Sequence, residues 1–187
     1  MRRLTLFVVG VAAALALMPA GAVADPNNEA AAFQLHIEVP NVAQASNGDR
    51  IAVTGMGTFS VHPKSVTASG GFTHTTSQGM LVGSGTWTAT DLLSFEFYGC
   101  GVVKGLGATL PANFCGGVLK LRVVFTPSGT SLAIPGKMTI FCVIGPQAPP
   151  THDNPTEPGE EGVHALIPGV ANFNEIVSGM NLYVRTS

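Results

Sequence analysis

Five side chains of the sequence have the chemistry to bind or transform a small molecule: His62, His74, Trp87, Glu96 and Tyr98. An imidazole or a carboxylate beside an apolar pocket can transfer protons, and two imidazoles with a carboxylate can bind zinc or copper. Tryptophan and tyrosine each offer a large ring with one polar atom, which suits contact with an aromatic molecule. We therefore expect a ligand site in this chain to draw on these five residues.

A metal site would depend on His62 and His74. A hairpin turning at 65–67 would bring the two imidazoles close together, with Asp49 or Asp91 as a further ligand. However, the sequence has no tight H-x-H or H-x3-H spacing, and both histidines stand among threonines and serines. We therefore predict two exposed histidines on a polar face, and no metal ion.

Signatures of exported hydrolases are missing from the sequence. No G-x-S-x-G elbow is present to expose a nucleophilic serine. Glu38, Glu96 and Glu175 could supply the paired carboxylates of a glycoside hydrolase, and Glu96, between two phenylalanines, is the best placed beside a pocket. A carboxylate on an alternating strand more often faces water. The sequence thus favours a protein without catalytic residues or a cofactor.

A repeated phrase shapes the elements that would position these residues. "GMGTFSV" at Gly55–Val61 and "GSGTWTA" at Gly83–Ala89 both contain Gly-x-Gly-Thr followed by an aromatic residue. A dinucleotide site would need a third glycine and a following helix, and neither is present. Because strand side chains alternate between two faces, Phe59 and Trp87 share a face with the bare glycines. We expect the rings to point inward over glycine backbone, with a glycine-floored ligand cavity as the alternative.

Strand-like alternation runs through almost the whole chain, at 33–39, 93–98, 119–125 and 180–184 among other segments. The segment 137–145 is apolar on both parities, which predicts a central strand covered on both faces. Glycine, proline, asparagine and serine interrupt these segments at strand-length intervals. The sequence predicts an all-β fold, a single-domain antiparallel β-barrel or sandwich of about eight strands.

The first 24 residues have the three parts of a secretory signal peptide. Two arginines precede an apolar run at 4–17, and an A-x-A cleavage signal follows at 22–24. No later apolar run is long enough to cross a membrane as a helix. We predict a secreted protein of the extracellular or cell-envelope space, with one β domain at 25–187 and no membrane insertion. A proline-rich acidic stretch at about 145–162 is expected to be a surface loop.

Export permits disulfide bonds, and the sequence contains three cysteines. An odd number leaves one thiol unpaired. Cys100 and Cys115 flank a glycine-rich loop, and closing that loop would stabilise the fold by about 3 kcal/mol. Cys142 lies in an apolar run that is typical of an inert buried thiol. The predicted pair is Cys100–Cys115, and Cys100–Cys142 is the alternative.

Charged residues make up 11% of the chain, with 9 lysines and arginines against 11 aspartates and glutamates. Such sparse and scattered positive charge cannot neutralise a run of phosphates, which argues against a nucleic-acid partner. An exterior rich in threonine and serine and poor in charge suits a carbohydrate, a protein or a small apolar ligand as the partner.

The stretch "MGTFSVHPKSVTASGGFTHT" and the following "GSGTWTATDLLSFEFYG" resemble segments of uncharacterised secreted bacterial proteins of similar length. The similarity extends from about Arg50 to the C-terminus and includes "NFCGG" and "GVANFN". It implies export and a β-rich fold, with no particular activity. In architecture alone, the predicted fold is also similar to the cofactor-free barrels of dirigent proteins and allene oxide cyclases.

These observations favour an exported, non-catalytic β module that contacts a partner or binds a small ligand. The competing interpretation is a cofactor-free barrel enzyme, dirigent-like or cyclase-like, acting on an apolar or aromatic molecule in the barrel mouth. An open interior with Tyr98, Glu96 or a histidine pointing inward would favour the enzyme. An interior filled by rings such as Phe59 and Trp87 would favour the module.

Overall fold

The computed structural model describes residues 31–103, 108–149 and 161–187. The predicted signal peptide at 1–24 and most of the predicted loop at 145–162 lie outside these ranges. Within them the chain forms strands, turns and irregular segments and no helix, which confirms the all-β class. No helix able to cross a membrane is therefore found in the described part of the chain.

Antiparallel strands account for most of the described residues. They are β1 (Ala32–Ala45), β2 (Arg50–Ser60), β3 (Ser65–Thr75), β4 (Leu81–Cys100), β5 (Val102–Val103), β6 (Ala108–Thr109), β7 (Phe114–Pro127), β8 (Ile134–Cys142), β9 (Gly162–Ile167), β10 (Ala171–Ser178) and β11 (Asn181–Arg185).

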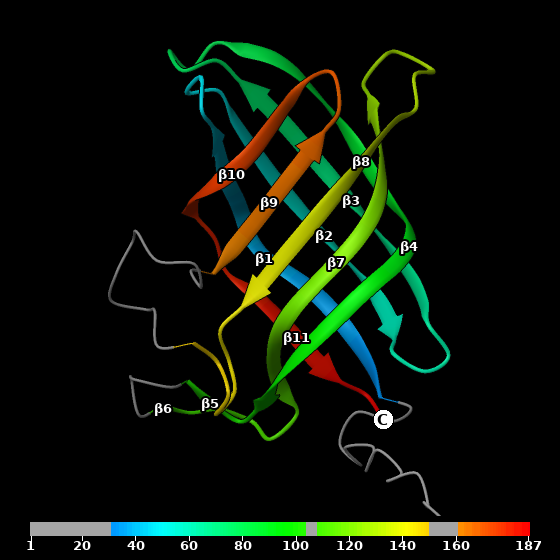
Figure 1. Cartoon of the computed structure of the whole chain (residues 1–187), viewed down its shortest axis with the longest axis vertical. Coiled ribbons are helices and arrows are strands. Elements are labelled where there is room, and N and C mark those ends of the chain that lie inside the picture. The colour runs from blue at the N-terminus through cyan, green and yellow to red at the C-terminus, as the bar shows by residue number, and fades with distance from the viewer. Residues whose placement is uncertain (1–30, 104–107, 150–160) are drawn as a thin grey trace, which may run out of the picture.

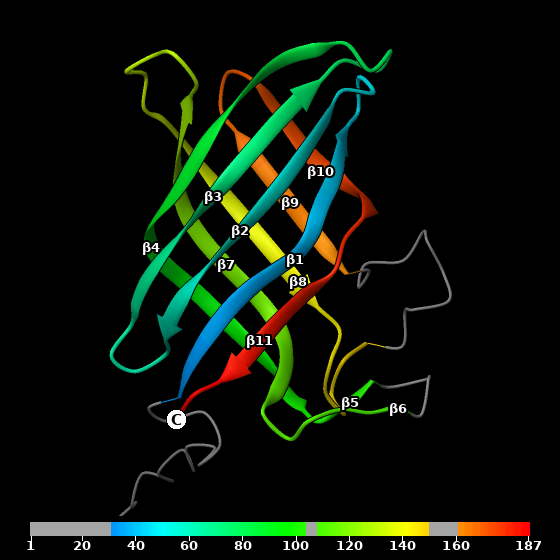
Figure 2. The same ribbon diagram turned by 180° about the vertical axis from the view of Figure 1, so that it is seen from behind.

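The main sheet has nine strands and closes on itself. Around the ring the order is β1, β2, β3, β4, β7, β8, β9 and β10, after which β10 pairs again with β1. Figures 1 and 2 show the two sides of the resulting cylinder. Of the two predicted architectures, barrel and sandwich, the structure is the barrel.

β10 and β11 share one place in the ring, because β1 pairs with each of them in turn. Residues 33–37 of β1 pair with β11, and residues 42–45 pair with β10. The register of β1 against β2 shifts between these two halves, from Ile37 to Asn41. β10 therefore borders one end of the barrel and β11 borders the other.

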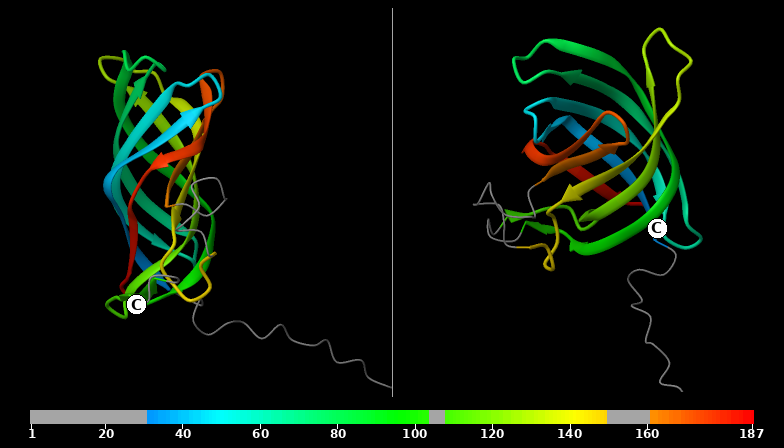
Figure 3. Two further views of the ribbon diagram at one scale, coloured as in Figure 1. Left: turned by 90° about the vertical axis from the view of Figure 1, so that its left-hand side faces the viewer. Right: turned by 45° about the horizontal axis from the view of Figure 1, so that its top comes forward.

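Four loops border one end of the barrel, which we call the mouth. They are the β1–β2, β3–β4, β7–β8 and β9–β10 connections, at the top of Figure 1. Figure 3 turns this end toward the viewer in its right-hand view. The short β5–β6 pair and the C-terminus lie at the opposite end.

The repeated phrase places its rings in the core, as predicted. Phe59 and Trp87 are 2% and 0% exposed. The indole Nε1 of Trp87 donates a hydrogen bond to the carbonyl of Thr54 at 2.8 Å. The same ring covers Gly55, where an added Cβ would stand 2.4 Å from Cζ2 of the indole. Bare backbone at Gly55 thus makes room for the largest side chain of the core.

Aromatic rings fill the half of the barrel away from the mouth. Phe33 stacks on Phe59 with ring centroids 5.1 Å apart, and Phe95 meets Phe59 edge-on at 4.9 Å. Tyr183 is completely buried, and its hydroxyl donates to the carbonyl of Ile140 at 2.8 Å. Each ring pair adds about 0.5–1.5 kcal/mol beyond the burial of its area. This half of the interior is a packed core.

The prediction that 137–145 is covered on both faces is wrong for the outer face. Met138 is buried inside the barrel, whereas Lys137 on the other parity is exposed. Phe141 is only half-buried, with its ring 4.8 Å from the imidazole of His164 on the outside of β9. Both parities are covered only at the end of this segment, where Cys142, Val143 and Ile144 are all buried.

Cys100 and Cys115 form a disulfide, and Cys142 is a buried free thiol. Cys100 and Cys115 lie opposite each other at the end of the β4–β7 ladder. The thiol of Cys142 donates to the carbonyl of Asn181 at 3.1 Å. The predicted pairing is therefore correct, and the alternative Cys100–Cys142 is excluded.

Candidate functional site

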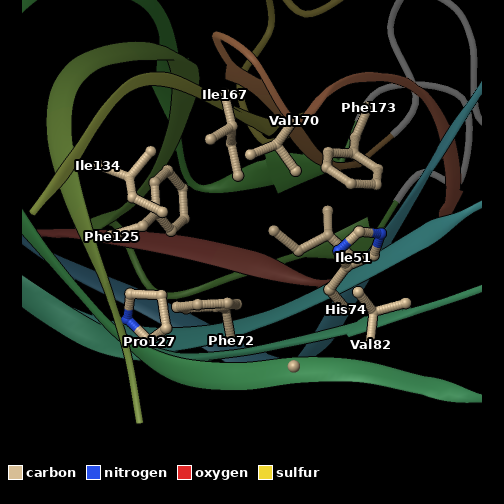
Figure 4. A pocket seen from close by; sticks show the side chains of 11 residues that line it. Ile51, Phe72, His74, Val82, Phe125, Pro127, Ile134, Ile167, Val170 and Phe173 are labelled. Carbon is tan, nitrogen blue, oxygen red and sulfur yellow. The ribbon is translucent and has the colours of Figure 1, made fainter. Parts of the chain in front are cut away.

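A pocket of about 200 Å³ opens at the mouth of the barrel (Figure 4). Its walls come from β2, β3, β4, β7, β8, β9, β10 and the β9–β10 loop, so the pocket occupies the axis of the cylinder. Ten of its lining residues are apolar and one is a histidine. They are Ile51, Phe72, His74, Val82, Gly83, Phe125, Pro127, Ile134, Ile167, Val170 and Phe173.

The pocket exists because the inward-facing residues at the strand ends do not meet at the axis. Phe72 and Phe125 close its inner side, with ring centroids 5.4 Å apart. Gly83 shares the inward parity of Trp87 but carries no side chain. No heavy atom lies within 4 Å of the position that a Cβ of Gly83 would take. The first glycine of the second phrase thus borders a cavity, whereas Gly55, its counterpart, lies under a ring.

His74 is the polar side chain in the pocket wall, and Asp49 holds it. The two side chains are 14% and 22% exposed, and Nε2 of His74 lies 3.3 Å from Oδ2 of Asp49. The ring of Phe173 meets the imidazole edge-on at 5.3 Å. In Figure 4 the imidazole lies along the wall beside Ile51 and Val82.

The β1–β2 turn fixes the position of Asp49. The backbone N–H of Asp49 donates to Oδ1 of Asn47 at 3.1 Å, and its carbonyl accepts from the N–H of Ala45 at 2.8 Å. Asparagine in this position forms a turn of its own side chain with the backbone two residues on. A rigid turn therefore presents the Asp49 carboxylate to His74.

The rim of the mouth is apolar and almost free of charge. Segments 76–82, 127–134 and 167–172 contain no lysine, arginine, aspartate or glutamate. Large apolar side chains in these segments face solvent: Met80, Leu81, Val82, Leu132 and Val170. Large contiguous apolar patches on a protein surface are typical of interaction sites.

The prediction of two exposed histidines is correct for His62 and wrong for His74, whose side chain is 14% exposed in the pocket wall. The alternative, in which the two imidazoles come close together, is not found. The β2–β3 hairpin turns at 61–64 rather than at 65–67, so His62 lies in the turn. His74 pairs with Ile51 near the other end of the hairpin. The eleven residues of β3 hold the two imidazoles roughly 30 Å apart. Among the described residues, no group of three or more His, Cys, Asp or Glu side chains could hold a metal ion.

Of the five predicted site residues, only His74 lines the pocket. Trp87 is completely buried beneath it in the core. Glu96 is exposed, and Tyr98 is half-buried near the far end of β4. Burial raises the pKa of the Tyr98 hydroxyl, and the neighbouring Glu96 carboxylate raises it further. Neither residue can reach a molecule in the mouth.

The apolar lining residues were not predicted from the sequence. Ile134, Ile167 and Phe173 are inward-facing residues at strand ends next to a turn. An inward-facing position at a strand end can be predicted from the sequence when the positions of the turns are known. The order of the strands around the barrel decides which strand ends lie together at the mouth, and this order was not predicted from the sequence.

Comparison with family models, with curated proteins and with solved structures finds no match to this chain. The function therefore rests on the chemistry of the site itself.

Proposed function

We propose that this protein is an exported, non-catalytic module that binds a small apolar molecule in the mouth pocket. The observation that carries the proposal is a cavity of about 200 Å³ in which every lining side chain except His74 is apolar. A dry apolar cavity of about 150 Å³ is enough to bind benzene. The pocket is therefore suited to a molecule of one ring with a few further atoms.

The surroundings of the pocket support an apolar ligand. Water in the pocket would find almost no hydrogen-bond partner, so its displacement by an apolar group is favourable. The uncharged rim lets such a molecule approach without stripping water from a charged side chain. A carbohydrate would leave most of its hydroxyls without partners in this pocket, and a protein segment would exceed its volume.

The disulfide supports the exported location. Bonds such as Cys100–Cys115 persist in oxidising compartments outside the cytoplasm. The signal peptide predicted at 1–24 accounts for the route there.

A blocking substitution tests the site. Gly83→Leu adds an isobutyl group at the pocket wall, where no heavy atom lies within 4 Å of the position that its Cβ would take. Thr86→Leu adds a similar apolar side chain on the exposed face of the same strand and serves as the matched control. We expect p-xylene to bind the wild type and Thr86→Leu equally, and Gly83→Leu at least tenfold more weakly, in isothermal titration. Absence of saturable binding to the wild type would contradict the proposal.

One observation favours a second candidate, a cofactor-free enzyme. His74 stands in an apolar wall with Asp49 on its Nε2, an arrangement that orients a histidine for proton transfer. The other lining side chains offer no nucleophile or acid. Mass spectrometry of the ligand recovered after prolonged incubation separates the candidates. Unchanged ligand supports the binding module, and an isomerised product, formed by proton transfer alone, supports the enzyme.

A further inference from the structure

Among the side chains that line the pocket, only His74 can form hydrogen bonds. The apolar lining side chains neither donate nor accept hydrogen bonds, so polar recognition of a ligand by a side chain falls to His74. Nε2 of this imidazole faces Oδ2 of Asp49 at 3.3 Å. Nδ1 has no hydrogen-bond partner among the described residues.

Asp49 determines which ring nitrogen carries the proton. An ionised carboxylate only accepts hydrogen bonds, so the nitrogen that faces it must donate. In a neutral imidazole the other nitrogen then has no proton and is an acceptor. With Nε2 donating to Asp49, Nδ1 is the nitrogen of His74 that keeps a free lone pair.

We propose that the mouth pocket selects a neutral, one-ring apolar molecule that carries a single O–H or N–H donor, which Nδ1 of His74 accepts. Phenols and simple aromatic amines have this chemistry. The inference rests on the proposed function, because it specifies the ligand of the same pocket.

The same geometry excludes other ligand classes. An anionic ligand would bring its charge close to the Asp49 carboxylate in an apolar setting, where repulsion between like charges is strong. A molecule with several hydroxyls would lose water from each of them and find one acceptor. A ligand that only accepts hydrogen bonds would meet the lone pair of Nδ1 with a lone pair of its own.

Three probes of nearly equal size test the inference: p-cresol, p-xylene and 4-fluorotoluene. They differ only in carrying a hydroxyl donor, a methyl group or a polar atom without a proton. We expect the full-length mature chain at pH 8 to bind p-cresol roughly fivefold or more tightly than the other two in isothermal titration. This ratio corresponds to one net hydrogen bond.

His74→Phe supplies the matched variant. Phenylalanine keeps a ring beside Phe173 and removes both nitrogens, so the preference for p-cresol should fall to about onefold while p-xylene still binds. The wild-type ratios decide the question even if this variant does not fold.

The outcomes distinguish the inference from the function beneath it. Equal binding of p-cresol and p-xylene to the wild type would overturn the inference and leave the proposed function standing. Binding of 4-fluorotoluene as tight as p-cresol, or a p-cresol preference that survives in His74→Phe, would also overturn it. If none of the probes binds, both proposals are wrong.

Discussion

The indole of Trp87 lies directly against the backbone of Gly55. A Cβ at Gly55 would stand 2.4 Å from Cζ2 of the indole and 2.7 Å from the carbonyl oxygen of Ser69. Neither neighbour can yield, since the ring is completely buried and the carbonyl belongs to the paired strand β3. Gly83 occupies the same place in the second copy of the phrase and has open space above it.

We therefore predict opposite behaviour for two identical substitutions. Gly55→Ala should lower the free energy of unfolding by about 1–3 kcal/mol, because it overpacks the core. Gly83→Ala should change it by no more than about 0.5 kcal/mol, because the methyl group enters free space. Denaturant titration followed by circular dichroism and by the fluorescence of Trp87 measures both. Equal losses in the two variants would show that the phrase has one structural role at both sites.

Trp87 and the glycines of the repeated phrase show how much of the structure can be predicted from the sequence. The two-residue period of a strand is local, so the inward direction of Phe59 and Trp87 could be predicted from neighbouring residues alone. The structural role of a glycine cannot be predicted from its neighbours in the sequence, because it depends on which side chain of another strand packs against it. Gly55 and Gly83 have the same local sequence and different roles for this reason.

The pocket shows the same limit more strongly. Ile51 and Phe173 are far apart in the sequence. They line one cavity because the order of the strands around the barrel brings their strand ends together. His62 and His74 are only twelve positions apart, yet a strand placed between them puts them at opposite ends of a hairpin. Cys100 and Cys115 could be predicted as a pair, because a glycine-rich loop between two strands brings its own ends together.

The half-buried carboxyl of Glu161 is expected to make the stability of the barrel depend on pH. Burial raises the pKa of Glu161 to about 7, although the backbone N–H of Asn181 donates to its carboxylate and opposes the shift. The unfolded chain has the ordinary value of 4.5. The folded state therefore holds the proton more tightly, and stability falls as the pH rises through the interval from 4.5 to 7.

Glu161→Gln should remove this dependence, because the amide carries no charge at any pH. We expect the variant and the wild type to unfold at similar temperatures near pH 4.5. At pH 8 the variant should be the more stable, by up to about 3 kcal/mol. Glu96→Gln, at an exposed carboxylate, is the control and should follow the wild type. A gain for Glu161→Gln that is the same at both pH values would refute this explanation.

The free thiol is predicted to be inert. Cys142 is 0% exposed, and burial raises the pKa of its thiol, so the reactive thiolate is scarce. A thiol reagent at pH 8 should label none of the three cysteines in the native protein and one after unfolding without reductant. Rapid labelling of the native protein would mean that Cys142 is accessible or that the disulfide joins other partners.

The disulfide should contribute to stability through the loop that it closes. The sequence separation of Cys100 and Cys115 is 15 residues. A loop of this size corresponds to about 3 kcal/mol in the chain-entropy model. The double variant Cys100→Ala/Cys115→Ala should lose up to this amount in denaturant titration while it keeps p-xylene binding, since neither cysteine lines the pocket. Loss of p-xylene binding in a variant that still folds would mean that the ligand binds near the disulfide and not at the mouth.

The central claim is that the mouth of the barrel holds the ligand site. Methyl-resolved NMR of the labelled mature chain during titration with p-xylene tests it most directly. We predict saturable shifts of the methyl groups of Ile51, Ile134 and Ile167, and no shift for Leu35 in the packed half. Shifts confined to Leu35 and its neighbours, or no saturable shift at all, would contradict the claim.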